Sequence, residues 1–130
     1  MSDVLRIEDL DTAGQWLHFD VGPHLERSYR QVTGWSGAER PWGLAAAVGR
    51  LAYTRGRTMP PGGVLREITL TTLGPAPANG RYLIRVDSDV RGEQARRRRV
   101  HVVTGLRQRD GAGVAEVGFV LDWPVVTPCG

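Results

Sequence analysis

The sequence predicts an α+β fold in which a long apolar helix is wrapped by a five-stranded antiparallel sheet. Three observations predict it: a strand-like segment near the start, an apolar helical stripe in the middle, and a run of strands that fills the chain after Gly63. The chain has 130 residues, of which 41% are hydrophobic and 24% are charged. That length and composition are typical of one compact unit, so we expect a single domain over residues 1–130.

The first half of the chain supplies one strand and two helices. Apolar residues alternate through residues 16–21, which predicts a strand, and Gly22-Pro23 ends it. Proline suits the first turn of a helix, which we expect to run from Pro23 to about Val32, with Gly34 as its C-terminal cap. The long helix is predicted by one buried stripe of apolar residues at helical spacing: Leu44, Ala47, Val48, Leu51 and Ala52.

The second half of the chain predicts four strands. They cover residues 64–72, 81–90, 100–106 and 115–123. Turn signals stand between them, at residues 74–77, at Arg91-Gly92-Glu93 and at Asp110-Gly111. Consecutive strands joined by short turns pair antiparallel. In the last strand, one face is expected to be apolar: Ala115, Val117, Phe119, Leu121 and Trp123.

The charged residues exclude several classes of function. All 17 basic residues are arginine, so no lysine can act as a Schiff base or general base. The net charge is only +3, and the arginine run at residues 96–99 has no interleaved aromatic residues, so we expect no nucleic-acid partner. Residues 1–10 alternate apolar and charged, so we expect no signal peptide, no membrane span and a cytoplasmic protein.

Residues that bind metals are few. Cys129 is the one cysteine, which excludes an internal disulfide and a cysteine-rich zinc site. His18, His24 and His101 are scattered and lack the spacing of metal ligands. We therefore expect no metal site and no cofactor.

Four short segments resemble the MaoC-like dehydratase/hydratase branch of the hotdog fold. They are the helix end Tyr29-Arg-Gln-Val-Thr-Gly34, the helix start Pro41-Trp-Gly-Leu44, the strand entry Gly74-Pro-Ala-Pro-Ala-Asn-Gly80, and Asp110-Gly111 followed by Val114-Ala-Glu116. The resemblance spans roughly residues 14–124. It implies that the α+β fold is a hotdog, with the long helix inside the curved sheet.

The resemblance also shows what this chain lacks. In that family, Thr-Gly at the first helix end runs into an Asp-x-Asn-Pro-x-His motif, whose Asp and His hold the water that adds to or leaves an acyl thioester. Here Thr33-Gly34 is followed by Trp35-Ser-Gly-Ala-Glu-Arg40, so the acid–base pair is missing from its usual place. The family's glycine near the start of the long helix is matched by Gly43, whose backbone amide is expected to bind the thioester carbonyl.

Three residues are candidates for catalysis, each with a plainer alternative. Gly43 offers a backbone amide at a helix N-terminus. Glu39 stands just before the long helix and is a candidate general base or nucleophile, or else a carboxylate that only stabilises the helix. His24, in the first turn of the short helix, is a candidate proton shuttle, although in the family this turn lies away from the thioester. Tyr29 is interpreted as a structural or surface residue.

Five further residues are candidates for substrate binding. Trp35 and Trp42 are expected to line an acyl pocket or to fill the space of the shortened loop. Arg40 is a candidate partner for a substrate anion or a solvated surface residue. Arg97 and Arg98 are candidates to hold the phosphates of coenzyme A or the acidic face of an acyl carrier protein, or else are a solvated strand end.

The resemblance implies an enzyme that acts on an acyl thioester of coenzyme A or acyl carrier protein. It would be a dehydratase- or cyclase-like lyase with a rebuilt site, in a polyketide or fatty-acid-type pathway. Two alternatives stay open: an acyl thioesterase that uses Glu39, and a catalytically silent subunit that binds a thioester or a partner. Because the predicted sheet has an open edge, we expect a homodimer, with a heterodimer as the alternative.

Overall fold

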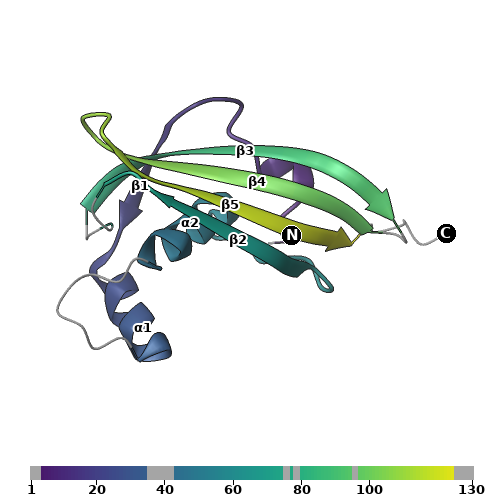
Figure 1. The fold of residues 1–130 in the computed structure, drawn as a ribbon, viewed down its shortest axis with the longest axis horizontal. Helices are drawn as coiled ribbons and strands as arrows, with labels where there is room; N and C mark the ends of the chain where they lie inside the picture. Colours follow the sequence, from purple (N-terminus) through teal and green to yellow (C-terminus); the bar gives the residue numbers. More distant parts are fainter. Residues whose placement is uncertain (1–3, 35–42, 75–76, 78–79, 95–96, 125–130) are drawn as a thin grey trace.

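The chain folds into one five-stranded antiparallel sheet with two helices on one side of it (Figure 1). The computed structural model describes residues 4–34, 43–74, 77, 80–94 and 97–124. The strands are ordered β1-β3-β4-β5-β2 across the sheet. Their bounds, with those of the helices, are η1 (Ile7–Asp9), β1 (Leu17–Val21), α1 (Pro23–Thr33), α2 (Leu44–Thr54), β2 (Val64–Thr72), β3 (Gly80–Gln94), β4 (Arg97–Gln108) and β5 (Gly113–Pro124).

The core lies between α2 and the inner face of the three central strands. Alternate residues of β3, β4 and β5 point at the helix, and the predicted apolar face of the last strand is confirmed. Tyr53 packs edge-on against Phe119, with ring centroids 5.0 Å apart. The fully buried side chains of this core include Val48, Tyr53, Ile84, Val86, Val100, Val102, Val117, Phe119 and Leu121.

The buried face of α2 is rotated from the predicted stripe. Of the predicted stripe, Leu44, Val48 and Ala52 are buried, whereas Ala47 is half-buried and Leu51 is 43% exposed. Ala45, Gly49 and Tyr53 complete the buried face. The reason is Gly49: a Cβ at this position would lie 3.1 Å from Cβ of Val117, so the helix approaches β5 through its smallest residue.

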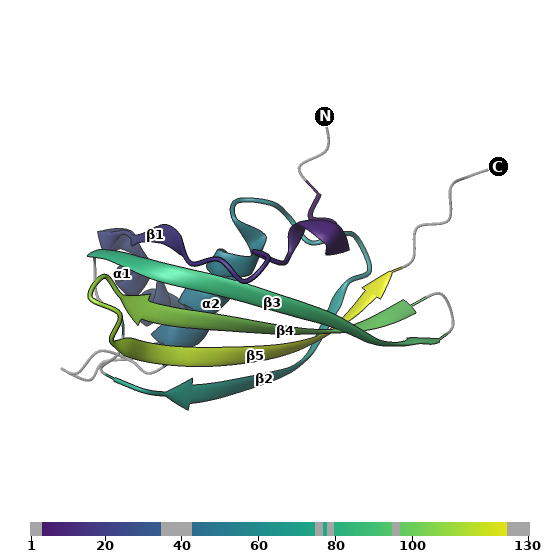
Figure 2. The same ribbon diagram turned by 90° about the horizontal axis from the view of Figure 1, so that it is seen from above.

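The turn predicted at Arg91-Gly92-Glu93 is wrong. β3 continues to Gln94, because a bulge between Val90 and Gly92 absorbs one residue and pairing with β4 resumes at Gly92. Three of the arginines in the predicted run therefore lie in a strand, Arg97–Gln108, rather than before one. As Figure 2 shows, the β3–β4 end of the sheet extends beyond α2.

A segment before β1 completes the core at that end. Leu5 and Leu10 are buried, although the charged residues beside them in the sequence give no sign that they belong to the core. The Leu5 N–H donates a 2.7 Å hydrogen bond to the Thr58 carbonyl, just beyond α2. We call residues 4–10 the N-terminal segment.

The opposite edge of the sheet is apolar and exposed. Leu65 and Ile68 of β2 pair with Leu121 and Phe119, so they face the side of the sheet that carries α2. They are nevertheless 44% and 47% exposed, because α2 does not reach far enough to cover them. With Leu51 they form what we call the β2 patch. Within the part of the chain that the structure describes, no helix has the length and apolarity needed to span a membrane.

Candidate functional site

The N-terminal end of α2 is a site where backbone donors lack a side-chain cap. Gly43 is the residue before the helix, and its carbonyl accepts the first helical bond, from the Ala47 N–H at 3.1 Å. Among the described residues no side chain caps this end, and the first turn holds no acidic residue. The first N–H groups of a helix have no partner within it and carry partial positive charge. A carbonyl oxygen that gains negative charge is well matched to them.

Tyr29 of α1 contacts Gly43 from the other side. The Tyr29 hydroxyl lies 1.8 Å from the place where a Cβ at position 43 would be, so any side chain there would displace the phenol. The phenol is half-buried, and its hydroxyl can donate one hydrogen bond. An uncapped helix end and a phenolic hydroxyl therefore lie together at the junction of α1 and α2.

The face of α1 that carries Tyr29 also carries a charged pair. Glu26 and Arg30 are one helical turn apart and form an ion pair at 3.3 Å, with both side chains half-buried. Sequence reasoning missed both residues: Tyr29 opens the helix-end segment that carries the resemblance but was interpreted as structural, and Glu26 belongs to no motif. The spacing of Leu25, Glu26 and Tyr29 marks one side of α1, but nothing in the sequence tells which helix that side meets.

Four predicted site residues lie outside the described residues: Trp35, Glu39, Arg40 and Trp42. They belong to the connection between Gly34, which ends α1 in a left-handed conformation, and Gly43. His24 is exposed in the first turn of α1, five residues before Tyr29 and on a different side of the helix. The structure therefore does not bring His24 to Gly43.

The other two histidines are also remote from this helix end. His18 is exposed on β1, and His101 lies on the outer face of β4, away from α2. Among the described residues no cluster of histidine, cysteine, aspartate and glutamate could hold a metal ion.

Arg97 and Arg98 lie at the other end of the molecule. About 16 Å of helix separate Gly43 from the C-terminal end of α2, and β4 begins beyond that end (Figure 1). Arg97 donates a 2.7 Å hydrogen bond to the Gly62 carbonyl, and Arg98 is half-buried on the inner face of the sheet. The structure thus separates these arginines from the Gly43 site within one chain.

Three solved structures share this fold. HtdX from Mycobacterium tuberculosis matches with a TM-score of 0.64 and 18% identity. The match covers 85% of this chain but only 47% of HtdX, so this chain spans about half the length of HtdX. R-hydratase PhaJ1 from Pseudomonas aeruginosa has a TM-score of 0.57 and 15% identity, with 94% of this chain and 93% of PhaJ1 covered. The ChsH1-ChsH2 complex from Mycobacterium tuberculosis has a TM-score of 0.50 and 13% identity, with 94% of this chain and 90% of that chain covered.

Sequence comparison adds nothing to these structural matches. No protein-family model matches the chain, and no curated protein matches it. At such low identities a structural match speaks to the fold and not to the reaction. The predicted fold is confirmed: this chain is a hotdog-fold protein, built like the R-hydratase PhaJ1.

Proposed function

We propose that this protein acts on an acyl thioester, carried by coenzyme A or acyl carrier protein, as a dehydratase- or cyclase-like enzyme with a rebuilt site. The observation that carries the proposal is the pairing of the uncapped α2 end at Gly43 with the Tyr29 hydroxyl. The fold shared with an R-hydratase supports it.

In this proposal the thioester carbonyl oxygen accepts hydrogen bonds from the Gly43 end of α2. Polarising that carbonyl acidifies the α-carbon, because the negative charge of the enolate is stabilised in place. For dehydration, a base takes the α-proton and then returns a proton to the departing 3-hydroxyl, which leaves as water and gives the enoyl thioester. Glu39 is the base that we propose, since it stands four residues before Gly43.

We also propose that the protein works as a dimer joined at β2. This strand is an edge of the sheet, and the β2 patch beside it is apolar and exposed. A homodimer is the simplest form, and a pairing with a second hotdog chain is the alternative; ChsH1-ChsH2 is a solved complex with this fold.

A catalytically silent subunit is the second candidate. It is favoured by the positions of the histidines, since His18 and His101 lie on the outer face and His24 is exposed. In this form the Gly43 end would still bind a thioester, but a partner would supply the acid and base.

The test is a panel of enoyl, 3-hydroxyacyl and saturated acyl thioesters of coenzyme A. Interconversion of enoyl and 3-hydroxyacyl thioesters supports the proposal, and Glu39→Gln should then lower kcat at least a hundredfold. Gly43→Ala should lower binding and turnover, because its Cβ would displace the Tyr29 hydroxyl from the helix end. Release of free thiol instead would identify a thioesterase, and binding without turnover would identify the silent subunit.

A further inference from the structure

A second groove lies at the end of the sheet that extends beyond α2. It has a volume of about 770 Å³ and opens between the N-terminal segment and the start of β4. Residues 4–9 form one wall, and Pro60, Arg98 and Trp123 contribute to the other. Neither Gly43 nor Tyr29 lines it, so it is separate from the site proposed above.

The wall made by the N-terminal segment is firmly held. The guanidinium of Arg55 donates hydrogen bonds to the carbonyls of Asp9 and Leu10. Leu5 is bonded to the Thr58 carbonyl at 2.7 Å. Burial, and then the charge of Arg57, lowers the pKa of Arg55, while Asp9 and Asp11 raise it less.

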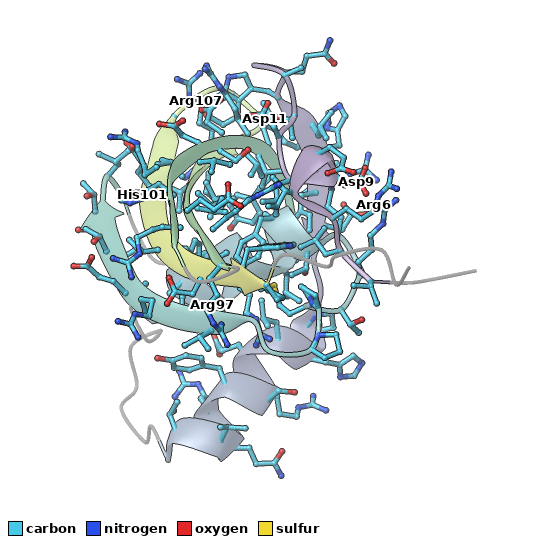
Figure 3. The ribbon with its side chains drawn as sticks, turned by 90° about the vertical axis from the view of Figure 1, so that its right-hand side faces the viewer. Arg6, Asp9, Asp11, Arg97, His101 and Arg107 are labelled. Atoms are coloured by element: carbon cyan, nitrogen blue, oxygen red, sulfur yellow. The ribbon has the colours of Figure 1, made fainter. Side chains whose placement is uncertain are left out.

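The acids of the groove are already paired. Asp9 forms ion pairs with Arg57 and Arg6, and Glu8 forms one with Arg6 at 3.4 Å. Figure 3, which looks onto this end, shows Arg6 and Asp9 together on the N-terminal segment. Among the described residues, the lining therefore has three arginines against two carboxylates, and Arg98 is the one of these arginines that pairs with neither carboxylate.

Arg98 also differs from its two neighbours in the strand, whose guanidinium groups are hydrogen-bonded. Arg97 bonds the Gly62 carbonyl, and Arg99 bonds the Asp122 carboxylate at 3.2 Å. Arg98 faces the groove, half-buried, and within the described ranges it has no hydrogen bond or ion pair. Glu93 stands opposite it in the β3–β4 register but is exposed and forms no ion pair with it.

The rest of the groove near Arg98 is apolar. Trp123 is opposite Arg98 in the β4–β5 register, so the two side chains lie next to each other on the inner face. Leu5, Pro60 and Pro124 extend that apolar surface. A guanidinium with open donors beside an indole and aliphatic side chains suits a ligand with one anionic group and an apolar tail.

We propose that this groove binds an amphipathic monoanion of the medium-chain carboxylate class. Its carboxylate accepts two hydrogen bonds from the fork of the Arg98 guanidinium. Its chain lies along the half-buried apolar residues of the lining, Val4, Ile7 and Pro124. The inference does not depend on the proposed function, because it concerns a different end of the molecule.

The test is a titration of the intact protein with decanoate, with its tryptophans replaced biosynthetically by 5-fluorotryptophan. The fluorine resonance of Trp123, assigned with Trp123→Phe, is expected to shift on binding. Arg98→Gln should raise the Kd for decanoate at least tenfold. The ligand 1-decanol has the same chain without the charge, and it should bind the wild type at least tenfold more weakly than decanoate does. The matched control Arg109→Gln removes one charge from an exposed hairpin residue at the opposite end and should leave the Kd unchanged.

Three results would overturn the proposal. The first is a Trp123 resonance that does not shift when decanoate is added. The second is an Arg98→Gln variant that binds decanoate with the wild-type Kd. The third is displacement of decanoate by an equal concentration of inorganic phosphate, which would indicate a site for any anion. Arg98→Lys, which keeps the charge but loses the fork, should bind with an intermediate Kd. Melting temperatures of all variants show whether the fold is intact, and none of these readouts requires thioester turnover.

Discussion

Gly49 is the residue through which α2 touches the sheet. A Cβ there would lie 3.1–3.3 Å from atoms of Val117 and Phe119. The Val117 contact is at its own Cβ, which cannot move without the backbone of β5. The missing side chain is therefore part of the packing, and not a defect of the helix.

Gly49→Ala tests this packing. Alanine gains up to about 1 kcal/mol in helix propensity, but overpacking a tight core costs about 1–3 kcal/mol. We expect the second effect to win, with a net loss of about 1 kcal/mol in the free energy of unfolding, measured by urea denaturation. The control Gly92→Ala meets open space and should change stability by less than about 0.5 kcal/mol. A Gly49→Ala variant that is more stable than the wild type would contradict the tight contact.

Tyr53 makes stability depend on alkaline pH. Burial raises the pKa of its phenol, while the charge and hydrogen bond of Arg50 lower it less. A raised pKa in the folded state means that the unfolded chain ionises first, so stability is full below about pH 10 and is lost as the pH rises towards the folded pKa. In that window the wild type should lose about 1.4 kcal/mol per pH unit more than Tyr53→Phe.

The measurement is urea denaturation at a series of pH values above neutrality. Tyr82→Phe is the control and should keep the wild-type slope, because Tyr53 is intact in it. The chain has no lysine, so no ammonium group titrates in the same range. Equal slopes for the wild type and Tyr53→Phe would mean that the phenol ionises without disturbing the fold.

The N-terminal segment shows how one element depends on a few contacts with another. It has no strand pairing beyond a single bridge between Val4 and Thr58. The segment is held in part by the burial of Leu5 and Leu10. It is also held by Arg55, which ends α2 in a left-handed conformation and donates hydrogen bonds to two carbonyls of the N-terminal segment. The end of α2 and the N-terminal segment are thus one structural unit.

Arg55→Met is expected to loosen this unit. Loss of hydrogen bonds from a charged donor should lower the free energy of unfolding by about 1–2 kcal/mol. The amide hydrogen of Leu5 should exchange faster, because its bond to Thr58 depends on the segment staying in place. Hydrogen exchange followed by mass spectrometry measures this, with Arg109→Met as the control. Unchanged protection of Leu5 would show that the buried leucines hold the segment by themselves.

Elements could be predicted from the sequence where one physical pattern dominated. β5 alternates between buried and less buried residues from Ala115 to Trp123, and all five expected core residues are buried. The stripe on α2 was predicted in part: Leu44, Val48 and Ala52 are buried, but small residues on several faces give no clear direction, and Gly49 faces the sheet instead of Leu51. The extension of β3 to Gln94 was missed because Arg91 and Gly92 read as a turn but form a bulge.

Sites were less predictable than elements. The role of Gly43 came from resemblance, and the structure added Tyr29, which lies fourteen residues earlier and contacts it only through the packing of α1 on α2. The arginine run could be seen in the sequence, but the alternation of β4 separates its members: Arg98 faces the groove, while Arg99 bonds Asp122 outside it. Contacts between distant segments decide both cases.

At the scale of the whole molecule, the β2 patch predicts self-association. Ile68→Glu places a carboxylate in the patch and should convert a dimer to a monomer, measured by sedimentation velocity at micromolar concentration. Thr71→Glu, on the outer face of the same strand, is the matched control and should leave the dimer intact. A wild-type protein that sediments as a monomer would contradict the proposed dimer.

The close contact at Gly49 also restricts the route that an acyl chain can take. Between α2 and β5 the interior is closed by Val117, and one turn later by Tyr53 packed edge-on against Phe119. A chain attached to a carbonyl at Gly43 therefore has no tunnel along that contact. Outside that contact, Leu51 and Ile68 present exposed apolar surface at the edge of the protomer. In the proposed dimer that acts on acyl thioesters, the length of the acyl group would then depend on the surface that a partner subunit presents, so that exchanging partners would change substrate length without any change in this chain.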